Sequence, residues 1–178
     1  IDRKMNIKGE DKAGVFSSSE FVGWYNGNPF FKDLPIDQNI KNVAIIGNGN
    51  VALDCARLLA KHDHEFYDSD IMTYSKNLIN NLNIENIYII GRRSPLEAKF
   101  TISELREIGE LKKFDPYVDF EMDLLKNILN ENNIDTKTKK NLELLCEFKE
   151  KEPSNKRNII FKFPLSPKEL IGEENVRK

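Results

Sequence analysis

Cysteine and histidine are scarce in this sequence, and their scarcity limits the kinds of site it can form. The 178 residues include 2 cysteines, Cys55 and Cys146, and 2 histidines, His62 and His64. Two cysteines cannot build a disulfide framework, so we expect reduced thiols in an intracellular compartment. No further ligands accompany either pair at metal-ligand spacing, so the sequence predicts no metal site.

Long apolar runs and a strong net charge are also lacking. No apolar run approaches the roughly 18 to 20 residues that span a bilayer, so we expect no membrane span. The formal net charge of -2 gives no general attraction to nucleic acid or to an anionic membrane. The chain begins with isoleucine and shows no targeting segment, so we expect it to be a piece of a longer protein.

What the sequence does contain is a strand, a helix and a strand in succession. The β-branched run VAII at 43–46 predicts a buried strand, and apolar residues at helical spacing predict a helix over 50–61. A helix over 71–82 and a second strand that ends at Gly91 follow. This order is typical of a βαβ unit, whose strands pair in parallel through a right-handed connection.

The second half of the chain is predicted to be rich in helix. Helices are expected over 101–111, 119–129 and 138–149, and a final strand is expected over 158–163. The predicted fold class is therefore α/β, a Rossmann-like dinucleotide-binding domain in which helices flank a parallel sheet. Apolar residues make up 39% of the sequence, which suits one globular domain.

The turn after the first predicted strand has the spacing of a phosphate-binding turn. Gly47, Gly49 and Ala52 fit the pattern G-x-G-x-x-A, in which glycines let a pyrophosphate approach the backbone. The pattern follows a predicted strand and opens a predicted helix, which is the context that the motif requires. The phosphates would then contact the N–H groups at the start of the helix. A plain tight turn between strand and helix is the alternative.

The end of the second predicted strand favours NADP over NAD. An NAD site usually carries an acidic residue there for the ribose hydroxyls, whereas an NADP site carries arginine for the 2′-phosphate. This sequence has Arg92 and Arg93 directly after Gly91 and no acidic residue beside them. Their planar guanidinium groups suit phosphate oxygens. An exposed basic loop without a ligand is the alternative.

Thr101 and Glu104 have the spacing of a capping box at the start of a predicted helix. In that motif the threonine hydroxyl accepts the glutamate N–H, and the glutamate carboxylate accepts the threonine N–H. We therefore expect a structural role for Glu104, and this role does not exclude a contact with a cofactor.

Three stretches, in this order and spacing, resemble one family. They are FVGWYNG at 21–27, GNGNVALDCAR at 47–57 and GRRSPLEAKFTISELRE at 91–107. Together they resemble adrenodoxin reductase, the mitochondrial-type ferredoxin-NADP reductase, from about Asp2 to the last predicted strand. The resemblance implies a two-domain flavoenzyme in which NADPH passes hydride to FAD, and FAD passes single electrons to a small acidic ferredoxin.

The resemblance implies that this chain is the NADP domain of such an enzyme, which the family inserts into its FAD domain. Residues 1–40 would be a connecting segment from the missing FAD domain, and residues 41–178 would form the NADP-binding domain. Without the FAD-binding parts the chain is expected to bind NADP weakly and to catalyse nothing. The family also implies a mitochondrial location.

The family's cofactor contacts can be transferred residue by residue. Its pyrophosphate turn falls on the glycine turn, its 2′-phosphate pair on the two arginines, and a further NADP contact on the glutamate of the capping box. The predicted cofactor-binding residues are Gly47, Asn48, Gly49, Asn50, Val51, Arg92, Arg93 and Glu104. The family typically has glutamine at position 48, so the shorter Asn48 is expected to lose one contact. No catalytic residue is predicted.

The resemblance also implies contacts with other proteins and domains. A basic docking patch for ferredoxin is expected, and Lys137, Lys139 and Lys140 are its candidates; a solvated lysine loop is the alternative. In the first of the three stretches, Trp24 or Tyr25 either faces the FAD domain or packs within the chain.

Two other classes of protein remain open at this point. One is another flavoprotein with two dinucleotide sites, such as the NADPH-oxidising small subunit of glutamate synthase, which usually shows redox cysteines or cluster ligands in its fuller chain. The other is a non-catalytic nucleotide-binding or interaction domain that keeps the fold. The sequence that flanks this chain would distinguish them.

Overall fold

The computed structural model divides into two compact units. It describes residues 4–67, 69–131, 133–152, 154, 156–173 and 176. Unit 1 comprises the described residues of 1–40, 63–83 and 166–178, and unit 2 comprises those of 41–62 and 84–165. Unit 2 contains the glycine turn and the arginine pair, so it is the unit in which a dinucleotide site is expected.

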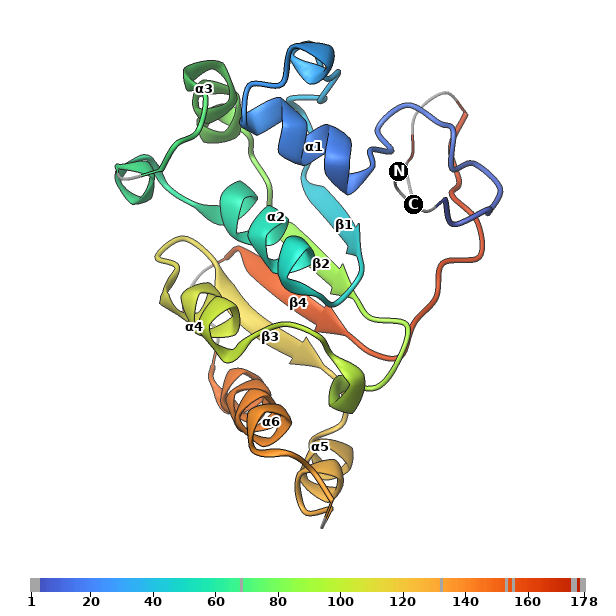
Figure 1. Ribbon diagram of the computed structural model, residues 1–178, viewed down its shortest axis with the longest axis vertical. Coiled ribbons are helices and arrows are strands. Elements are labelled where there is room, and N and C mark those ends of the chain that lie inside the picture. Colours follow the sequence, from blue (N-terminus) through green and yellow to red (C-terminus); the bar gives the residue numbers. More distant parts are fainter. Residues whose placement is uncertain are drawn as a thin grey trace. The chain divides into compact units, whose positions relative to one another are not determined.

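Unit 2 is built on a four-stranded parallel sheet (Figure 1). Its strands are β1 (Asn42–Ile46), β2 (Asn86–Ile90), β3 (Asp115–Asp119) and β4 (Asn158–Lys162). The order across the sheet is β1-β2-β4-β3, and each neighbouring pair is parallel. The predicted α/β fold class is confirmed, and so is the parallel pairing of the first two predicted strands.

The helices of unit 2 pack against one another and against the sheet. They are α2 (Asn50–Ala60), α4 (Ile102–Glu110), α5 (Met122–Leu129) and α6 (Thr136–Glu150), with a short 3-10 helix η3 (Pro95–Glu97). Helix α2 contacts β1, β2 and α4, whereas α6 contacts β3, α4 and α5. Helix α4 therefore lies between α2 and α6, and its position depends on both neighbours.

The core of unit 2 forms because the side chains of alternate strand residues lie on the same face of the sheet. Ile87, Ile89, Ile159 and Phe161 of β2 and β4 have no exposed surface. The ring of Phe161 packs against that of Phe148 in α6, with 6.3 Å between the ring centroids. Burying each side chain of this size stabilises the fold by roughly 1.5 to 3 kcal/mol.

Strand β3 is missing from the sequence-based prediction, which places a helix over 119–129 where α5 begins only at Met122. The strand has 5 residues, with aspartate at both ends and Pro116 inside, and these residue types are rare in strands. The strand forms by pairing with β4, and its position at the edge of the sheet tolerates the proline. Its partner β4 comes much later in the sequence, so the local pattern does not reveal the pairing.

Asparagine side chains join the amino ends of three strands of the sheet. Asn42, Asn86 and Asn158 occupy one register position on β1, β2 and β4, and we call them the asparagine ladder. Nδ2 of Asn86 donates to Oδ1 of Asn42 at 2.9 Å, and Nδ2 of Asn158 donates to Oδ1 of Asn86 at 3.3 Å. In the same row, the buried Asp115 of β3 accepts the backbone N–H of Ser154 at 2.6 Å.

Unit 1 contains α1 (Ser18–Tyr25), α3 (Thr73–Asn81) and the 3-10 helices η1 (Pro29–Phe31) and η2 (Asp63–Phe66). Trp24 of α1 is buried, and its carbonyl accepts the hydroxyl of Tyr74 at 2.6 Å. Trp24 therefore packs within unit 1, which is one of the two roles expected for it. In the part of the chain that the structure describes, no helix combines the length and the apolar character needed to cross a membrane.

Candidate dinucleotide-binding site

The turn between β1 and α2 has a backbone shape that requires glycine at its first position. Gly47 has a φ of +143°, which side chains other than glycine rarely adopt. Its N–H donates to the carbonyl of Ile90 in β2 at 2.9 Å, so the turn starts in contact with the neighbouring strand. Gly49 is the N-cap of α2 and offers no side chain to cap the helix. We call residues 47–50 the glycine turn.

The first N–H groups of α2 are open to a ligand. Among the described residues, no hydrogen-bond acceptor contacts the backbone N–H of Gly49, Asn50 or Val51. Within the described part of the chain, no heavy atom outside its chain neighbours would lie within 4 Å of a Cβ placed on Gly49, and Val51 is 51% exposed. Open N–H groups and the positive end of the helix dipole together attract an anion, so the N-terminus of α2 has the form of a phosphate site.

Gly91, which directly precedes the arginine pair, is tightly packed. A Cβ on Gly91 would lie 2.7 Å from two ring atoms of Phe163 and 3.0 Å from Nδ2 of Asn48, so only glycine fits against both. Arg92 and Arg93 follow and are exposed. Nη1 of Arg93 contacts Oε1 of Glu97 at 3.1 Å.

Arg92 has no ion-pair partner among the described residues, so its guanidinium group is available to an anion. We call residues 91–101, which connect β2 to the N-cap of α4, the arginine loop. Of the two arginines, Arg92 is therefore the one that a phosphate can engage without breaking an existing ion pair.

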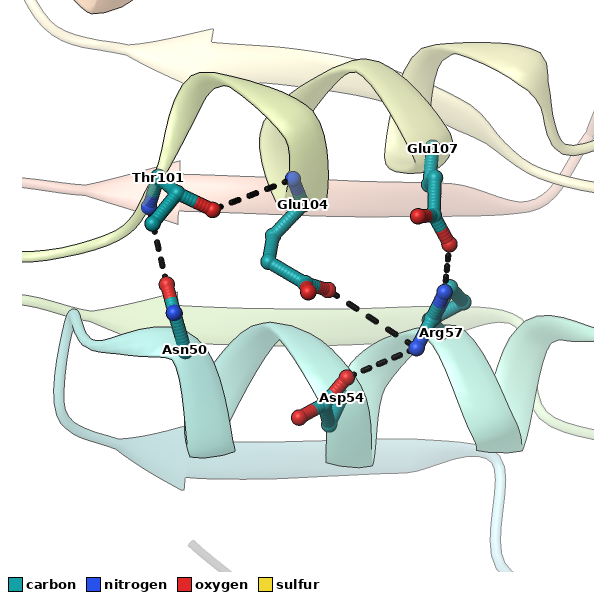
Figure 2. Close-up of polar contacts among 6 residues, drawn as sticks. All are labelled: Asn50, Asp54, Arg57, Thr101, Glu104 and Glu107. Atoms are coloured by element: carbon teal, nitrogen blue, oxygen red, sulfur yellow. Dashed lines mark hydrogen bonds and ion pairs between the residues drawn. The ribbon is translucent and has the colours of Figure 1, made fainter. Parts of the chain in front are cut away.

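Two hydrogen bonds tie the arginine loop to the glycine turn. The N–H of Lys99 donates to the carbonyl of Asn48 at 2.9 Å. The N–H of Thr101 donates to Oδ1 of Asn50 at 2.8 Å, as Figure 2 shows. The structure thus joins the two motifs that the sequence analysis treats as separate. The sequence carries no local signal for these bonds, because they join residues about 50 positions apart.

The predicted capping box is only half formed. The hydroxyl of Thr101 accepts the N–H of Glu104 at 3.4 Å, which caps α4 as expected. The return bond from the Glu104 carboxylate is absent, since the N–H of Thr101 is taken by Asn50. That part of the prediction is wrong, because the capping pattern considers one helix alone and a residue of α2 competes for the same N–H.

The carboxylate of Glu104 instead joins a cluster between α2 and α4 (Figure 2). Oε2 of Glu104 lies 3.7 Å from Nη2 of Arg57, and the same guanidinium group contacts Asp54 at 2.7 Å and also Glu107. Burial, together with the charge of Asp54, raises the pKa of the Glu104 carboxyl, and Arg57 opposes this shift. The three carboxylates around this one arginine hold α4 against α2, but the single positive charge only partly offsets the negative charge of Glu104.

Comparisons with known proteins identify relatives of this chain. No protein-family model matches the sequence. NADPH-ferredoxin reductase FprA of Mycobacterium tuberculosis is 36% identical over 181 residues, covering 99% of this chain and 39% of that protein. The probable mitochondrial NADPH:adrenodoxin oxidoreductase of Dictyostelium discoideum is 38% identical over 179 residues, covering 97% of this chain and 35% of that protein. A solved structure of Mycobacterium tuberculosis FprA in complex with NADPH matches 98% of this chain and 39% of that one, with a TM-score of 0.86 and 33% identity.

The chain is a homologue of the adrenodoxin-type NADPH reductases. The resemblance of the three sequence stretches to that family is confirmed. The match spans 39% of the length of FprA, so the homology concerns one part of these proteins. The relatives are named as ferredoxin or adrenodoxin reductases, which favours this family over the glutamate synthase alternative.

The three lysines that the sequence analysis names as candidates for a docking patch lie at the start of α6. Lys137, Lys139 and Lys140 are exposed in the first turns of α6. The carboxylate of Asp135 caps this helix by accepting the N–H groups of Lys137 and Thr138 at 2.9 and 3.0 Å. Positive charge is disfavoured at a helix N-terminus, but this carboxylate offsets it. The position of the lysines is therefore compatible with the start of a helix.

Proposed function

We propose that unit 2 binds NADP(H) as part of a flavin-dependent ferredoxin or adrenodoxin reductase. The observation that carries the proposal is that the arginine loop lies beside the open N-terminus of α2, joined to it through Asn48 and Asn50. The loop offers cations for a 2′-phosphate, and the helix offers N–H groups for a pyrophosphate. NADP(H) carries both groups on one ribose, so a single ligand fits both.

In this proposal the glycine turn binds the pyrophosphate through its backbone. Gly47 and Gly49 allow the phosphates to approach, and the N–H groups of Asn50 and Val51 donate to their oxygens. The carbonyl of Asn48 is already used by the arginine loop, so Asn48 contributes through its N–H and its amide. This assignment explains why the open groups of the turn are backbone groups and why its cap is a glycine.

The arginines select the 2′-phosphate. Arg92 is available, and Arg93 exchanges an exposed ion pair with Glu97, worth at most about 1 kcal/mol, for the phosphate. Glu104 remains a proposed cofactor contact. Its carboxylate faces Arg57, so this contact requires the side chain to rotate out of the cluster between α2 and α4.

The activity itself needs parts beyond this chain. We assign FAD to the portion of the relatives' length that this chain does not match, and we assign residues 1–40 to the connection with it. The flavin would accept hydride from NADPH and release single electrons. The residues of this chain bind and orient NADPH, so none of them is given a catalytic role.

The electron acceptor is proposed to be a small acidic iron–sulfur protein of the ferredoxin or adrenodoxin type. The names of the relatives support this class, and Lys137, Lys139 and Lys140 offer exposed positive charge for it. A mitochondrial location is proposed on the names of the eukaryotic relatives, such as that of Bos taurus; the name of FprA does not include it.

Two measurements test the proposal. Calorimetric titration of the 178-residue chain with NADPH, NADH and 2′-phospho-AMP should give clearly tighter binding of the two ligands that carry a 2′-phosphate. Equal binding of NADPH and NADH would contradict the cofactor assignment. A longer version of the protein should be yellow and should reduce ferredoxin with NADPH; a colourless, inactive protein would instead support a non-catalytic nucleotide-binding domain.

A further inference from the structure

The side chain of Asn50 connects the glycine turn to the start of α4. Asn50 is the first residue of α2, yet its Oδ1 accepts the N–H of Thr101, the N-cap residue of α4, at 2.8 Å. The Glu104 carboxylate would occupy this place in a complete capping box. Asn50 is therefore part of the cap of a helix other than its own.

This bond helps to fix one end of the arginine loop, where Phe100 is also buried and its carbonyl accepts Nδ2 of Asn141 at 2.9 Å. At the other end, the N–H of Gly91 donates to the carbonyl of Lys162 at 2.9 Å, and its carbonyl accepts the N–H of Leu165 at 2.9 Å. Between the two ends, the side chains of Arg92 and Arg93 are exposed and do not pack into the core. The distance from the guanidinium groups to the N-terminus of α2 therefore depends on how the ends of the loop are held.

The backbone and side chain of Asn50 have separate roles in this arrangement. Its N–H belongs to the open end of α2, whereas its side chain points to α4 (Figure 2). A substitution that shortens the side chain leaves the N–H in place. The two roles can therefore be distinguished by experiment.

We propose that Asn50 is a positioning residue for cofactor selection. Through Thr101 it holds the arginine loop beside the N-terminus of α2, so that the arginines and the open N–H groups can bind the 2′-phosphate and the pyrophosphate of one ribose. Removing its side chain should therefore weaken recognition of the 2′-phosphate more than binding of the pyrophosphate. This inference rests on the proposed binding of NADP(H) by unit 2.

The first test compares Asn50→Ala with Asn42→Ala in the 178-residue chain. Asn42 is a matched control, because its side chain also accepts one hydrogen bond, in the asparagine ladder. Asn50→Ala should weaken NADPH binding about fivefold to tenfold and NADH binding by less than about twofold, whereas Asn42→Ala should leave their ratio unchanged.

The outcomes of this test separate the inference from the function on which it rests. Equal losses for NADPH and NADH in Asn50→Ala, or no loss for either, would overturn the positioning role and leave NADP binding intact. A wild-type chain without preference for NADPH would overturn both.

A second test follows the hydrogen bond itself. Amide hydrogen exchange of Thr101 should be faster in Asn50→Ala than in the wild type, and exchange of Lys99, whose acceptor is the carbonyl of Asn48, should change less. Asn50→Asp keeps an acceptor for this N–H, so Thr101 should stay protected in that variant. Unchanged exchange at Thr101 in Asn50→Ala, together with a lost NADPH preference, would show that the preference does not act through this hydrogen bond and would contradict the inference.

Discussion

The two ends of the strands in unit 2 form two edges of the sheet, an amino edge and a carboxyl edge, and these edges differ in whether their polar groups have partners. At the amino ends of the strands, the asparagine ladder pairs its side chains with one another, and the buried Asp115 is bound by Ser154. At the carboxyl ends, the N–H groups of Gly49, Asn50 and Val51 lack acceptors within the described residues, and the two arginines of the arginine loop are exposed. One edge satisfies its own polar groups, whereas the other leaves them open to a ligand.

This difference follows from the fold class and from the local sequence together. In open parallel sheets, ligands bind beyond the carboxyl ends of the strands, where the helix N-termini also lie. Here the carboxyl edge carries Gly47, Gly49 and Gly91, which bring the backbone of the turn and loop together, and the amino edge carries none of them. Changes at the two edges should therefore separate binding from stability.

The largest effect on stability is expected for Gly91→Ala. The added methyl would lie 2.7 Å from the buried ring of Phe163 and 3.0 Å from Asn48, so the ring or the loop must move. Overpacking of this kind costs about 1 to 3 kcal/mol in the free energy of unfolding. Urea denaturation measures this cost, and NADPH affinity should fall with it. A variant of wild-type stability would show that the contact between loop and turn is loose.

Gly47→Ala and Gly49→Ala form a matched pair on the same turn. Alanine at position 47 must adopt a φ of +143°, at a cost of about 1 to 2 kcal/mol in stability. Among the described residues, alanine at Gly49 meets no atom beyond its chain neighbours within 4 Å, so stability should fall by less than about 1 kcal/mol, the cost of a poorer N-cap. The methyl of Gly49→Ala should still weaken dinucleotide binding, measured by calorimetry. Equal stability losses in the two variants would contradict this difference.

At the amino edge, Asn86→Ala should lower stability by about 1 kcal/mol without changing cofactor affinity. Asn86 is the middle member of the asparagine ladder, and its loss leaves Asn42 and Asn158 without their partner. Denaturation and NADPH titration of the same sample check both statements. A reduced preference for NADPH in this variant would show that the edges are coupled.

The smallest effect is expected for Glu104→Gln, and it should depend on pH. The pKa of Glu104 is raised above its ordinary value of 4.5, so the folded chain holds this proton more tightly than the unfolded chain. The free energy of unfolding of the wild type therefore decreases as the pH rises from the unfolded-state pKa of Glu104 through its higher folded-state pKa. Glutamine does not titrate, so the variant lacks this decrease. The stability of Glu104→Gln relative to the wild type should rise between pH 4 and pH 7, measured by urea denaturation. A constant difference would contradict the assignment.

The sequence predicts those parts of unit 2 that depend on short-range pattern. The strand at 43–46 is found as β1 over Asn42–Ile46, and the helix over 50–61 is found as α2 over Asn50–Ala60. The final strand over 158–163 is found as β4. In each case a run of apolar residues and an adjacent glycine or proline mark the ends, and both are visible locally.

The features that the sequence does not predict depend on contacts between distant residues. Strand β3 contains Pro116 and is stabilised by pairing with β4. The carboxylate of Glu104 turns to Arg57 because Asn50 already occupies the N–H of Thr101. Neither outcome can be deduced from one helix or strand alone, because each depends on a residue from another element.

The most direct test of the account is the cofactor preference of the double variant Arg92→Ala, Arg93→Ala. Titration of this variant and of the wild type with NADPH and NADH should show NADPH affinity reduced at least about tenfold and NADH affinity unchanged within about twofold. The wild-type preference for NADPH should then disappear. An NADPH preference that survives the loss of both guanidinium groups would contradict the claim that the carboxyl edge of the sheet recognises the 2′-phosphate through the arginine loop.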